Sequence, residues 1–163
     1  MKRLLVAFLL AGSLAILAAP LGWHEDFARA QGYARKTHRP MLLNFTGSDW
    51  CIWCKRMQAE TLSQKPFIAY ASTNLLLVEV DFPNSPPQTK ERQEANEALK
   101  LRYNVSGFPT FVLVDAEGNE LGRQVGYLKG GVPAFTKELN EWRATQSTNT
   151  PPAAPAPAAS ATK

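Results

Sequence analysis

Trp50-Cys51-Ile52-Trp53-Cys54-Lys55 contains both cysteines of the 163-residue chain, separated by two residues. This hexapeptide follows an apolar run over 41–45 and leads into a helix-like pattern. At the first turn of a helix, Cys51 would face unpaired backbone N–H groups and the positive end of the helix dipole, which lower the pKa of a thiol. A disulfide that closes so short a loop restricts the unfolded chain very little. The two cysteines are therefore predicted to be a reactive pair rather than a structural crosslink.

The segments next to the hexapeptide alternate between helical and strand patterns. Before it, the spacing of apolar residues predicts a helix over 23–37 and a buried strand over 41–45. After it, Ser48 or Asp49 can cap a helix that begins near Cys51. The inner face of that helix is predicted to carry Cys54, Met57, Thr61 and Leu62.

The remainder of the chain continues this alternation and ends in a hairpin and a helix. The patterns predict a short helical turn within 63–74, a strand over 75–82, a mostly solvated charged helix over 88–103, strands over 111–114 and 120–126, and a last helix that follows Gly130-Gly131 and has Pro133 in its first turn. Strands separated by helices need right-handed crossovers and pair parallel, whereas a hairpin adds antiparallel strands. We expect an α/β domain with a mixed parallel and antiparallel sheet of four to five strands and helices on both faces.

The two ends of the chain differ in composition from the rest. The basic start Met1-Lys2-Arg3 and the uncharged, Leu- and Ala-rich run over 4–19 predict a signal peptide at 1–19, with an uncleaved membrane anchor as the alternative. Residues 146–163 are rich in Pro and Ala and are predicted to form a disordered tail, which leaves 23–145 as the folded domain. The protein is expected to be periplasmic or otherwise exported, and membrane-anchored only if the N-terminal segment is retained.

The charge balance argues against nucleic acid as a partner. The chain has 18 Lys and Arg residues against 14 Asp and Glu residues, and loss of Lys2 and Arg3 with a signal peptide would leave a net charge of about +2. A nucleic-acid-binding domain would retain a basic stripe after such trimming.

The hexapeptide and a second segment, Tyr-Asn-Val-Ser-Gly-Phe-Pro-Thr at 103–110, together resemble the thioredoxin-fold thiol:disulfide oxidoreductases. The similarity covers roughly Trp23 to Arg143. Because Trp stands on both sides of Cys51 and the sequence Thr-Gly-Ser-Asp precedes the motif at 46–49, it is closer to the exported members than to cytosolic thioredoxin. The resemblance implies a thioredoxin fold and exchange of a dithiol with protein disulfides.

Each matching residue acquires an expected role from this resemblance. Cys51 would be the attacking thiolate, Cys54 the resolving thiol, and Pro109 a cis proline opposite them. A cis bond before Pro109 would place the backbone polar groups of Phe108 where an extended substrate strand can pair beside the sulfur. No cofactor is implied beyond the redox-active disulfide itself. The expected partners are protein thiols and disulfides and an unidentified redox partner, and the protein is expected to be a monomer.

Aromatic residues around the motif bear on substrate binding and on the direction of electron flow. Trp50, Trp53 and Phe108 are predicted to form an apolar rim around the Cys51 sulfur, with Trp50 partly in the core and Trp53 in contact with substrate. Neither Ile52 nor Trp53 is a histidine, the residue that stabilises the thiolate in strongly oxidising members. Reductase or isomerase activity is therefore favoured.

One position departs from the thioredoxin pattern. Thioredoxins place a buried carboxylate beneath the active site to exchange protons with the resolving cysteine, and the matching position here is Asn44. An amide cannot accept that proton. Glu79, in the strand predicted over 75–82, is a candidate substitute, although on a strand face we expect it to point to solvent.

Three other interpretations of the motif remain. A zinc site could combine the cysteines with His24 and His38, but these histidines lie at no usual ligand spacing. A copper-handling module would use a Met or His near the thiols, and the nearby Met57 is expected to lie in the core instead. A binding module without turnover would contain the same disulfide as a purely structural bond.

Overall fold

A computed structural model describes residues 22–149, and their strands form one mixed five-stranded sheet. The strands are β1 (Trp23–His24), β2 (Met41–Thr46), β3 (Leu76–Asp81), β4 (Thr110–Val114) and β5 (Glu120–Val125). They lie in the order β1-β3-β2-β4-β5. Strands β1, β3 and β2 are parallel to one another, whereas β4 is antiparallel to β2 and β5 is antiparallel to β4. The predicted mixed sheet, with its closing hairpin, is confirmed.

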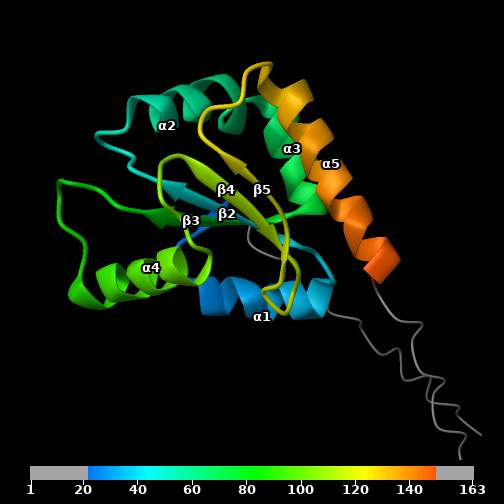
Figure 1. Cartoon of the computed structure of the whole chain (residues 1–163), viewed down its shortest axis with the longest axis horizontal. Helices are drawn as coiled ribbons and strands as arrows, with labels where there is room; N and C mark the ends of the chain where they lie inside the picture. Colours follow the sequence, from blue (N-terminus) through cyan, green and yellow to red (C-terminus); the bar gives the residue numbers. More distant parts are fainter. Residues whose placement is uncertain (1–21, 150–163) are drawn as a thin grey trace, which may run out of the picture.

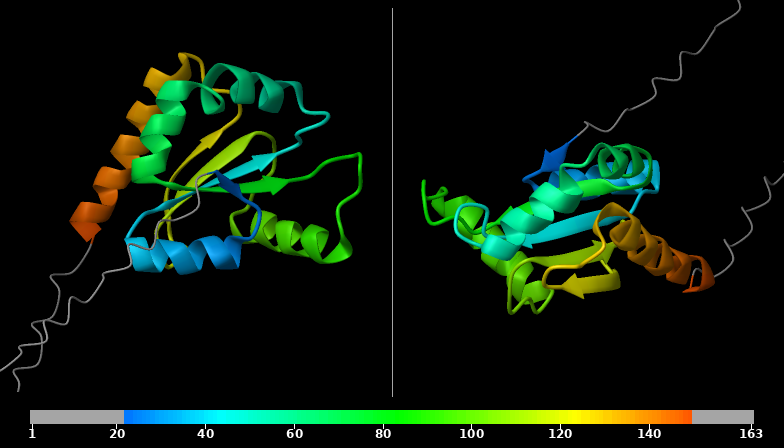
Figure 2. Two further views of the ribbon diagram at one scale, coloured as in Figure 1. Left: turned by 180° about the vertical axis from the view of Figure 1, so that it is seen from behind. Right: turned by 90° about the horizontal axis from the view of Figure 1, so that it is seen from above.

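Helices cover both faces of this sheet, as predicted (Figure 1). Helices α1 (Phe27–Thr37) and α4 (Lys90–Arg102) lie on one face. The other face carries α2 (Ile52–Met57), which continues as the π-helical turn η1 (Gln58–Leu62), together with α3 (Lys65–Asn74) and α5 (Gly131–Asn149). Figure 2 shows the same layers from behind and from above. The only residue of α4 classed as buried is Asn96, which fits the predicted solvated helix.

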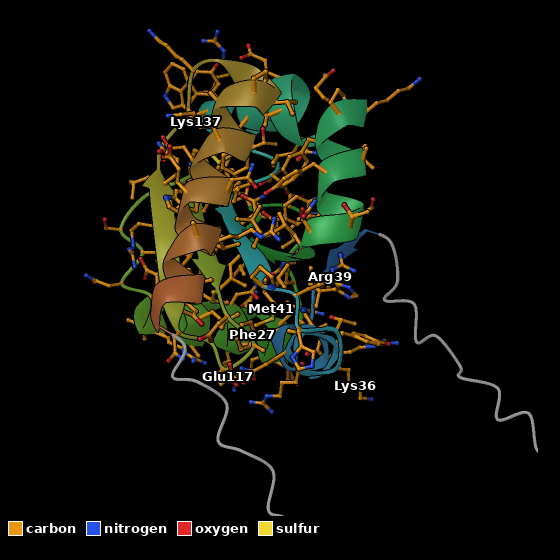
Figure 3. All side chains as sticks on the ribbon, turned by 90° about the vertical axis from the view of Figure 1, so that its right-hand side faces the viewer. Phe27, Lys36, Arg39, Met41, Glu117 and Lys137 are labelled. Atoms are coloured by element: carbon orange, nitrogen blue, oxygen red, sulfur yellow. A yellow bond between two sulfur atoms is a disulfide. The ribbon has the colours of Figure 1, made fainter. Side chains whose placement is uncertain are left out.

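Strand β2 lies in the middle of the sheet and is buried along its whole length. Met41, Leu43 and Phe45 belong to the apolar cluster shared with α1, whereas Leu42 belongs to the cluster shared with α3 and α5. Figure 3 shows Met41 between the layers, while Lys36 and Lys137 project from the surface. The chain that follows β2 therefore leaves from a rigid element, which fixes where the hexapeptide begins.

The predicted helix over 23–37 is wrong at its start. Trp23–His24 forms β1 and pairs with β3, and helix α1 begins only at Phe27. Asp26 is extended, and its side chain accepts a hydrogen bond from the backbone N–H of Arg29, which makes it the N-terminal cap. As an edge strand, β1 pairs backbone groups of β3 that would otherwise be open, and it places Trp23 against the apolar cluster on the α3 side.

Two helices are longer than predicted. Helix α3 spans ten residues in place of the short turn, with Pro66 in its first turn as expected. Helix α5 continues to Asn149, past residue 146, where the Pro- and Ala-rich tail was expected to start. The proposed signal peptide, 1–19, and the rest of the tail lie outside the described residues. Among residues 22–149, no helix combines the length and apolar character needed to cross a membrane.

Candidate active site

The hexapeptide forms a tight turn between β2 and α2. The backbone N–H of Cys51 donates to the carbonyl of Gly47 (2.9 Å), and Cys51 and Cys54 form a disulfide with their Cα atoms 5.2 Å apart. Cys51 is itself the N-terminal cap of α2, because its Sγ accepts from the backbone N–H of Cys54 at 3.1 Å. Both cysteine residues are buried, at 6% and 4% exposure. An N–H group aimed at Sγ stabilises negative charge on that sulfur, which is the property of an attacking thiolate.

Ser48 and Asp49 do not cap α2, contrary to the sequence prediction. Ser48 donates from both its N–H and its Oγ to the carboxylate of Asp81, at the end of β3. The carboxylate of Asp49 accepts from the backbone N–H groups of Asn84 and Ser85 in the loop after β3. Desolvation acts to raise the pKa of Asp49, but these backbone hydrogen bonds outweigh it and hold the pKa below its usual range. The two side chains thus fasten the turn to the neighbouring strand and loop.

Pro109 begins the second part of the site. The peptide bond from Phe108 to Pro109 is cis, as the resemblance implies. The next residue, Thr110, pairs with Phe45 of β2, so the cis bond lies beside the end of the strand that leads to the hexapeptide. The Phe108 ring also meets the Trp50 ring edge to face, with centroids 5.8 Å apart. The cis proline and the motif therefore come together although they are more than fifty residues apart in sequence.

An exposed apolar surface surrounds the motif on its outer side. We define the rim as Trp50, Ile52, Trp53 and Phe108, of which the first three are 46%, 69% and 50% exposed. Trp50 is fixed by a hydrogen bond from its Nε1 to the carbonyl of Phe82 (2.8 Å). Its indole leaves no room at residue 47, where a Cβ atom would lie 2.4 Å from it, so glycine is required there.

Two residues that sequence reasoning missed, Arg56 and Tyr127, pack against the rim at Trp53. The Arg56 guanidinium lies 5.9 Å from the centroid of the Trp53 ring and 4.7 Å from that of Tyr127, and the two rings lie 5.7 Å apart. Glu60 accepts hydrogen bonds from both Arg56 and the Tyr127 hydroxyl. These bonds hold the pKa of the Glu60 carboxyl below its usual range, with the Tyr127 bond the larger cause. Tyr127 follows β5, and no motif in the sequence pointed to it.

The sheet-facing side of the motif has a different character. We define the floor as Asn44, Cys54, Met57 and Glu79. Cys54 lines a cavity of about 470 Å³ together with Asn44 and Glu79. Asn44 is 3% exposed, and its Oδ1 has no hydrogen-bond partner among the described residues. Burial raises the pKa of Glu79, and the nearby charges of Asp81 and Glu25 raise it further.

The expectation that Glu79 points to solvent is therefore wrong. Glu79 is half-buried and pairs in register with Asn44 on the neighbouring strand, so both side chains project from the sheet toward α2. Side chains of paired residues in a parallel ladder leave the same face of the sheet. The sequence showed an acidic residue in an apolar strand, but not which face it occupied.

The residues considered for metal binding do not gather at the motif. Met57 is fully buried in the apolar core, as expected. His24 lies in β1 and His38 follows α1, and neither lines the cavity that contains Cys54. Among residues 22–149 there is no group of three or more His, Cys, Asp or Glu side chains that could hold a metal ion.

Similarity to known proteins agrees with this geometry. A family model described as a thioredoxin-like domain matches residues 27–141. The chain is 43% identical over 124 residues to the disulfide bond reductase DsbH of Chlamydia pneumoniae, over 76% of this chain and 74% of that protein. A solved structure of DsbH oxidoreductase superposes with a TM-score of 0.70 and 39% identity, over 84% of this chain and 94% of that one.

A second relative is a much longer protein. The thiol:disulfide interchange protein DsbD of Cronobacter sakazakii is 32% identical over 118 residues, which are 71% of this chain but only 18% of DsbD. The five-stranded sheet, the Cys51–Cys54 disulfide at the start of α2 and the family match all lead to one assignment. The chain belongs to the thioredoxin-like family of thiol:disulfide oxidoreductases.

Proposed function

We propose that this protein is an exported reductase of protein disulfides, in which Cys51 attacks the substrate and Cys54 resolves the mixed disulfide. The observation that carries the proposal is the Cys51–Cys54 disulfide at the first turn of α2, where an N–H group points at the Cys51 sulfur. The reducing direction is supported by the 43% identity to a protein named a disulfide bond reductase. Export is supported by the basic start and apolar run over 1–19.

The reaction proceeds in two exchanges from the reduced protein. The Cys51 thiolate attacks one sulfur of the substrate disulfide, which forms a mixed disulfide and releases the other substrate sulfur as a thiolate. Cys54 then loses its proton and attacks Cys51 Sγ, which forms the Cys51–Cys54 disulfide and releases the second substrate thiolate. The substrate disulfide gains two electrons and the protein dithiol loses them. A dithiol redox partner must reduce the protein again before the next turnover.

The rim supplies a surface for the substrate chain. Trp50, Trp53 and Phe108 would contact apolar side chains next to the substrate disulfide, since exposed aromatic clusters of this kind mark binding surfaces. The cis bond before Pro109 lies beside the motif, where an extended substrate segment could pair with the backbone of Phe108. In this proposal Pro109 shapes the surface and carries no chemical step.

The two cysteines are tested by trapping. Cys54→Ser should accumulate mixed disulfides with partner proteins, because the resolving thiol is absent, whereas Cys51→Ser should trap few. The variants are expressed with the full chain, alkylated on lysis and compared on non-reducing gels, with Cys51→Ser/Cys54→Ser as the control. Equal trapping by both single variants would contradict the assigned roles.

The direction of electron flow is tested by a redox titration. Equilibration with glutathione buffers, followed by Trp fluorescence, should give a potential nearer to the reducing end of the family range, about −270 mV, than to its oxidising end, about −120 mV. A potential at the oxidising end would contradict the reductase assignment but leave the thiol exchange itself in place.

A further inference from the structure

The second exchange needs a proton acceptor, and the sequence offers none at the usual position. Cys54 is 4% exposed, so bulk solvent has little access to its thiol. Asn44, on β2, carries an amide that cannot take up a proton. This inference rests on the proposed thiol exchange and asks where the Cys54 proton goes.

The cavity under the motif contains one carboxylate among the described residues that line it. That carboxylate is Glu79, and Cys54 lines the same cavity. The volume of about 470 Å³ exceeds the roughly 30 Å³ that one water molecule occupies, so water can connect groups across it. Because Glu79 stands directly opposite Asn44 in the β2–β3 register, its carboxylate comes from the neighbouring strand on the face toward α2.

Asn44 provides a second, independent observation. Its side chain is 97% buried, lines the same cavity, and has an Oδ1 atom without a hydrogen-bond partner among the described residues. A buried amide oxygen of this kind requires a donor, since an unpaired polar group costs about 1–3 kcal/mol. A protonated Glu79 carboxyl, the Cys54 thiol or a bridging water would each supply one. A protonated Glu79 carboxyl is thus one of the donors that this cavity can offer to Asn44 Oδ1.

The charges around Glu79 suit a group that both accepts and returns a proton. Burial raises its pKa, and the carboxylates of Asp81 on β3 and Glu25 before α1 raise it further. Lys55 of α2 lines the Cys54 cavity, and Arg92 of α4 lines a second cavity on the Glu25 side, so positive charges also face Glu79. A carboxyl whose pKa lies closer to neutral pH is a better general base and acid than one at its ordinary value.

We propose that Glu79 is the proton acceptor for Cys54 and takes over, from the adjacent strand, the task that Asn44 cannot perform. In the mixed disulfide, the Glu79 carboxylate removes the proton of the Cys54 thiol, directly or through water in the cavity. The Cys54 thiolate attacks Cys51 Sγ, the bond from Cys51 to the substrate sulfur breaks, and the electron pair leaves with that sulfur. The Glu79 carboxyl then releases its proton to the departing thiolate or to solvent.

The test separates the two exchanges in one experiment. The reduced full chain is mixed with an excess of dithiobis(nitrobenzoate) in a stopped-flow instrument, and the release of two coloured thiolates is followed from pH 5 to pH 9. Glu79→Gln should leave the first release, by Cys51, within about twofold of wild type. It should slow the second release at least tenfold at pH 7. This loss is smaller than the rate factor of about 10²–10⁴ that general-base catalysis typically contributes, because solvent base can partly replace the carboxylate.

The pH profile distinguishes a proton acceptor from a structural residue. In the wild type the second release should speed up as pH rises through the Glu79 pKa and then level off, because the carboxylate is the active form. In Glu79→Gln it should rise only with deprotonation of Cys54 itself and meet the wild-type rate at high pH. Asn44→Asp added to Glu79→Gln should restore part of the lost rate by returning a carboxylate to the cavity.

Glu25→Gln is the matched control. It removes a carboxylate that raises the pKa of Glu79 but does not line the Cys54 cavity. In Glu25→Gln the pH profile of the second release should keep the wild-type shape and plateau but lie at lower pH, because the pKa of Glu79 falls. A second release in Glu79→Gln equal to wild type across the whole pH range would overturn the role of Glu79, while two releases per chain would still support the proposed exchange. A chain that releases no coloured thiolate would overturn the proposed function itself.

Discussion

The rim and the floor lie on opposite sides of the same two cysteines and differ in almost every physical property. Trp50, Ile52 and Trp53 are roughly half or more exposed, apolar, and set among aromatic neighbours. On the floor, Cys54 and Met57 are buried, and Asn44 and Glu79 place polar groups around a cavity. The rim therefore presents exposed apolar surface, whereas the floor combines buried side chains with a carboxyl whose pKa is raised by burial.

In the proposed mechanism, this difference places the two steps of a disulfide exchange on two surfaces. In that mechanism, Cys51 attacks the substrate beneath the exposed rim. In the same proposed mechanism, Cys54 attacks from the floor side, where it lines a cavity together with Glu79. Substitutions on the two sides should therefore change different quantities, and four experiments test that separation.

The largest effect is expected on the stability of the floor. Met57→Ala should lower the free energy of unfolding by about 2–5 kcal/mol, because Met57 is fully buried and its removal leaves a cavity. Met57→Leu, which nearly conserves volume, should cost less than about 1.5 kcal/mol. Urea unfolding of the oxidised protein gives both values. A small loss of unfolding free energy in Met57→Ala would mean that contacts of the rim, and not those of the floor, hold α2 in place.

A substitution at the base of the rim should have an intermediate effect. Gly47→Ala should lower the free energy of unfolding by about 1–3 kcal/mol, because the added Cβ would lie 2.4 Å from the Trp50 indole. If the clash is the cause, Trp50→Ala should relieve it, and a double-mutant cycle should give a coupling of about 0.5–3 kcal/mol. Strict additivity of the two substitutions would show that the cost has another origin.

The exposed rim should affect binding without affecting stability. Trp53→Ala should weaken the interaction with a disulfide-containing peptide by at least about tenfold, as expected for a central aromatic contact, and change unfolding by less than about 0.5 kcal/mol. Peptide affinity is measured on the Cys51→Ser/Cys54→Ser background to exclude covalent capture. Ile68→Ala removes another exposed apolar side chain, on α3, and should leave affinity unchanged. Equal losses of peptide affinity in both variants would show that the rim has no specific role in peptide binding.

The smallest effect concerns Glu79 and depends on pH. Its pKa is raised in the folded protein by burial, so ionisation of Glu79 opposes folding. The destabilisation caused by ionised Glu79 should be absent below the ordinary carboxyl pKa, about 4.3, and should grow as pH rises through the raised value. Glu79→Gln should therefore be more stable than wild type at pH 7.5 and show little difference at pH 4. Chemical unfolding of both oxidised proteins at the two pH values gives this difference in free energy of unfolding. The same difference at pH 4 and at pH 7.5 would contradict the prediction.

Much of the fold could be predicted because the spacing of apolar residues and the turn residues between elements were clear. The apolar run over 41–45 is β2, and the turn at 115–119 joins β4 to β5 as a hairpin. The error at Trp23–His24 has a physical cause. Two residues are too few to show an alternating strand pattern, and they form a strand only because they pair with β3, far along the chain. The length of α3 was underestimated because Ser63–Asn74 has only a weak amphipathic pattern.

The site was predictable where one residue type defines the chemistry and not where packing defines it. The pairing of Cys51 with Cys54 and the cis bond before Pro109 follow from short motifs. Arg56 and Tyr127 come together from α2 and the loop after β5, and no local pattern records such a contact. The orientation of Glu79 depends on the register between β2 and β3, which a single sequence does not display.

The close approach of the Trp50 indole to residue 47 has a consequence for how such sequences diverge. Because a side chain at residue 47 and an indole at residue 50 compete for the same space, residue 47 cannot vary freely while Trp50 stays in place. Descendants that lose the glycine should also have replaced the tryptophan or moved its ring away from the Phe82 carbonyl. Loss of the glycine should therefore be accompanied by a change at residue 50, whereas residue 50 can change while the glycine is kept.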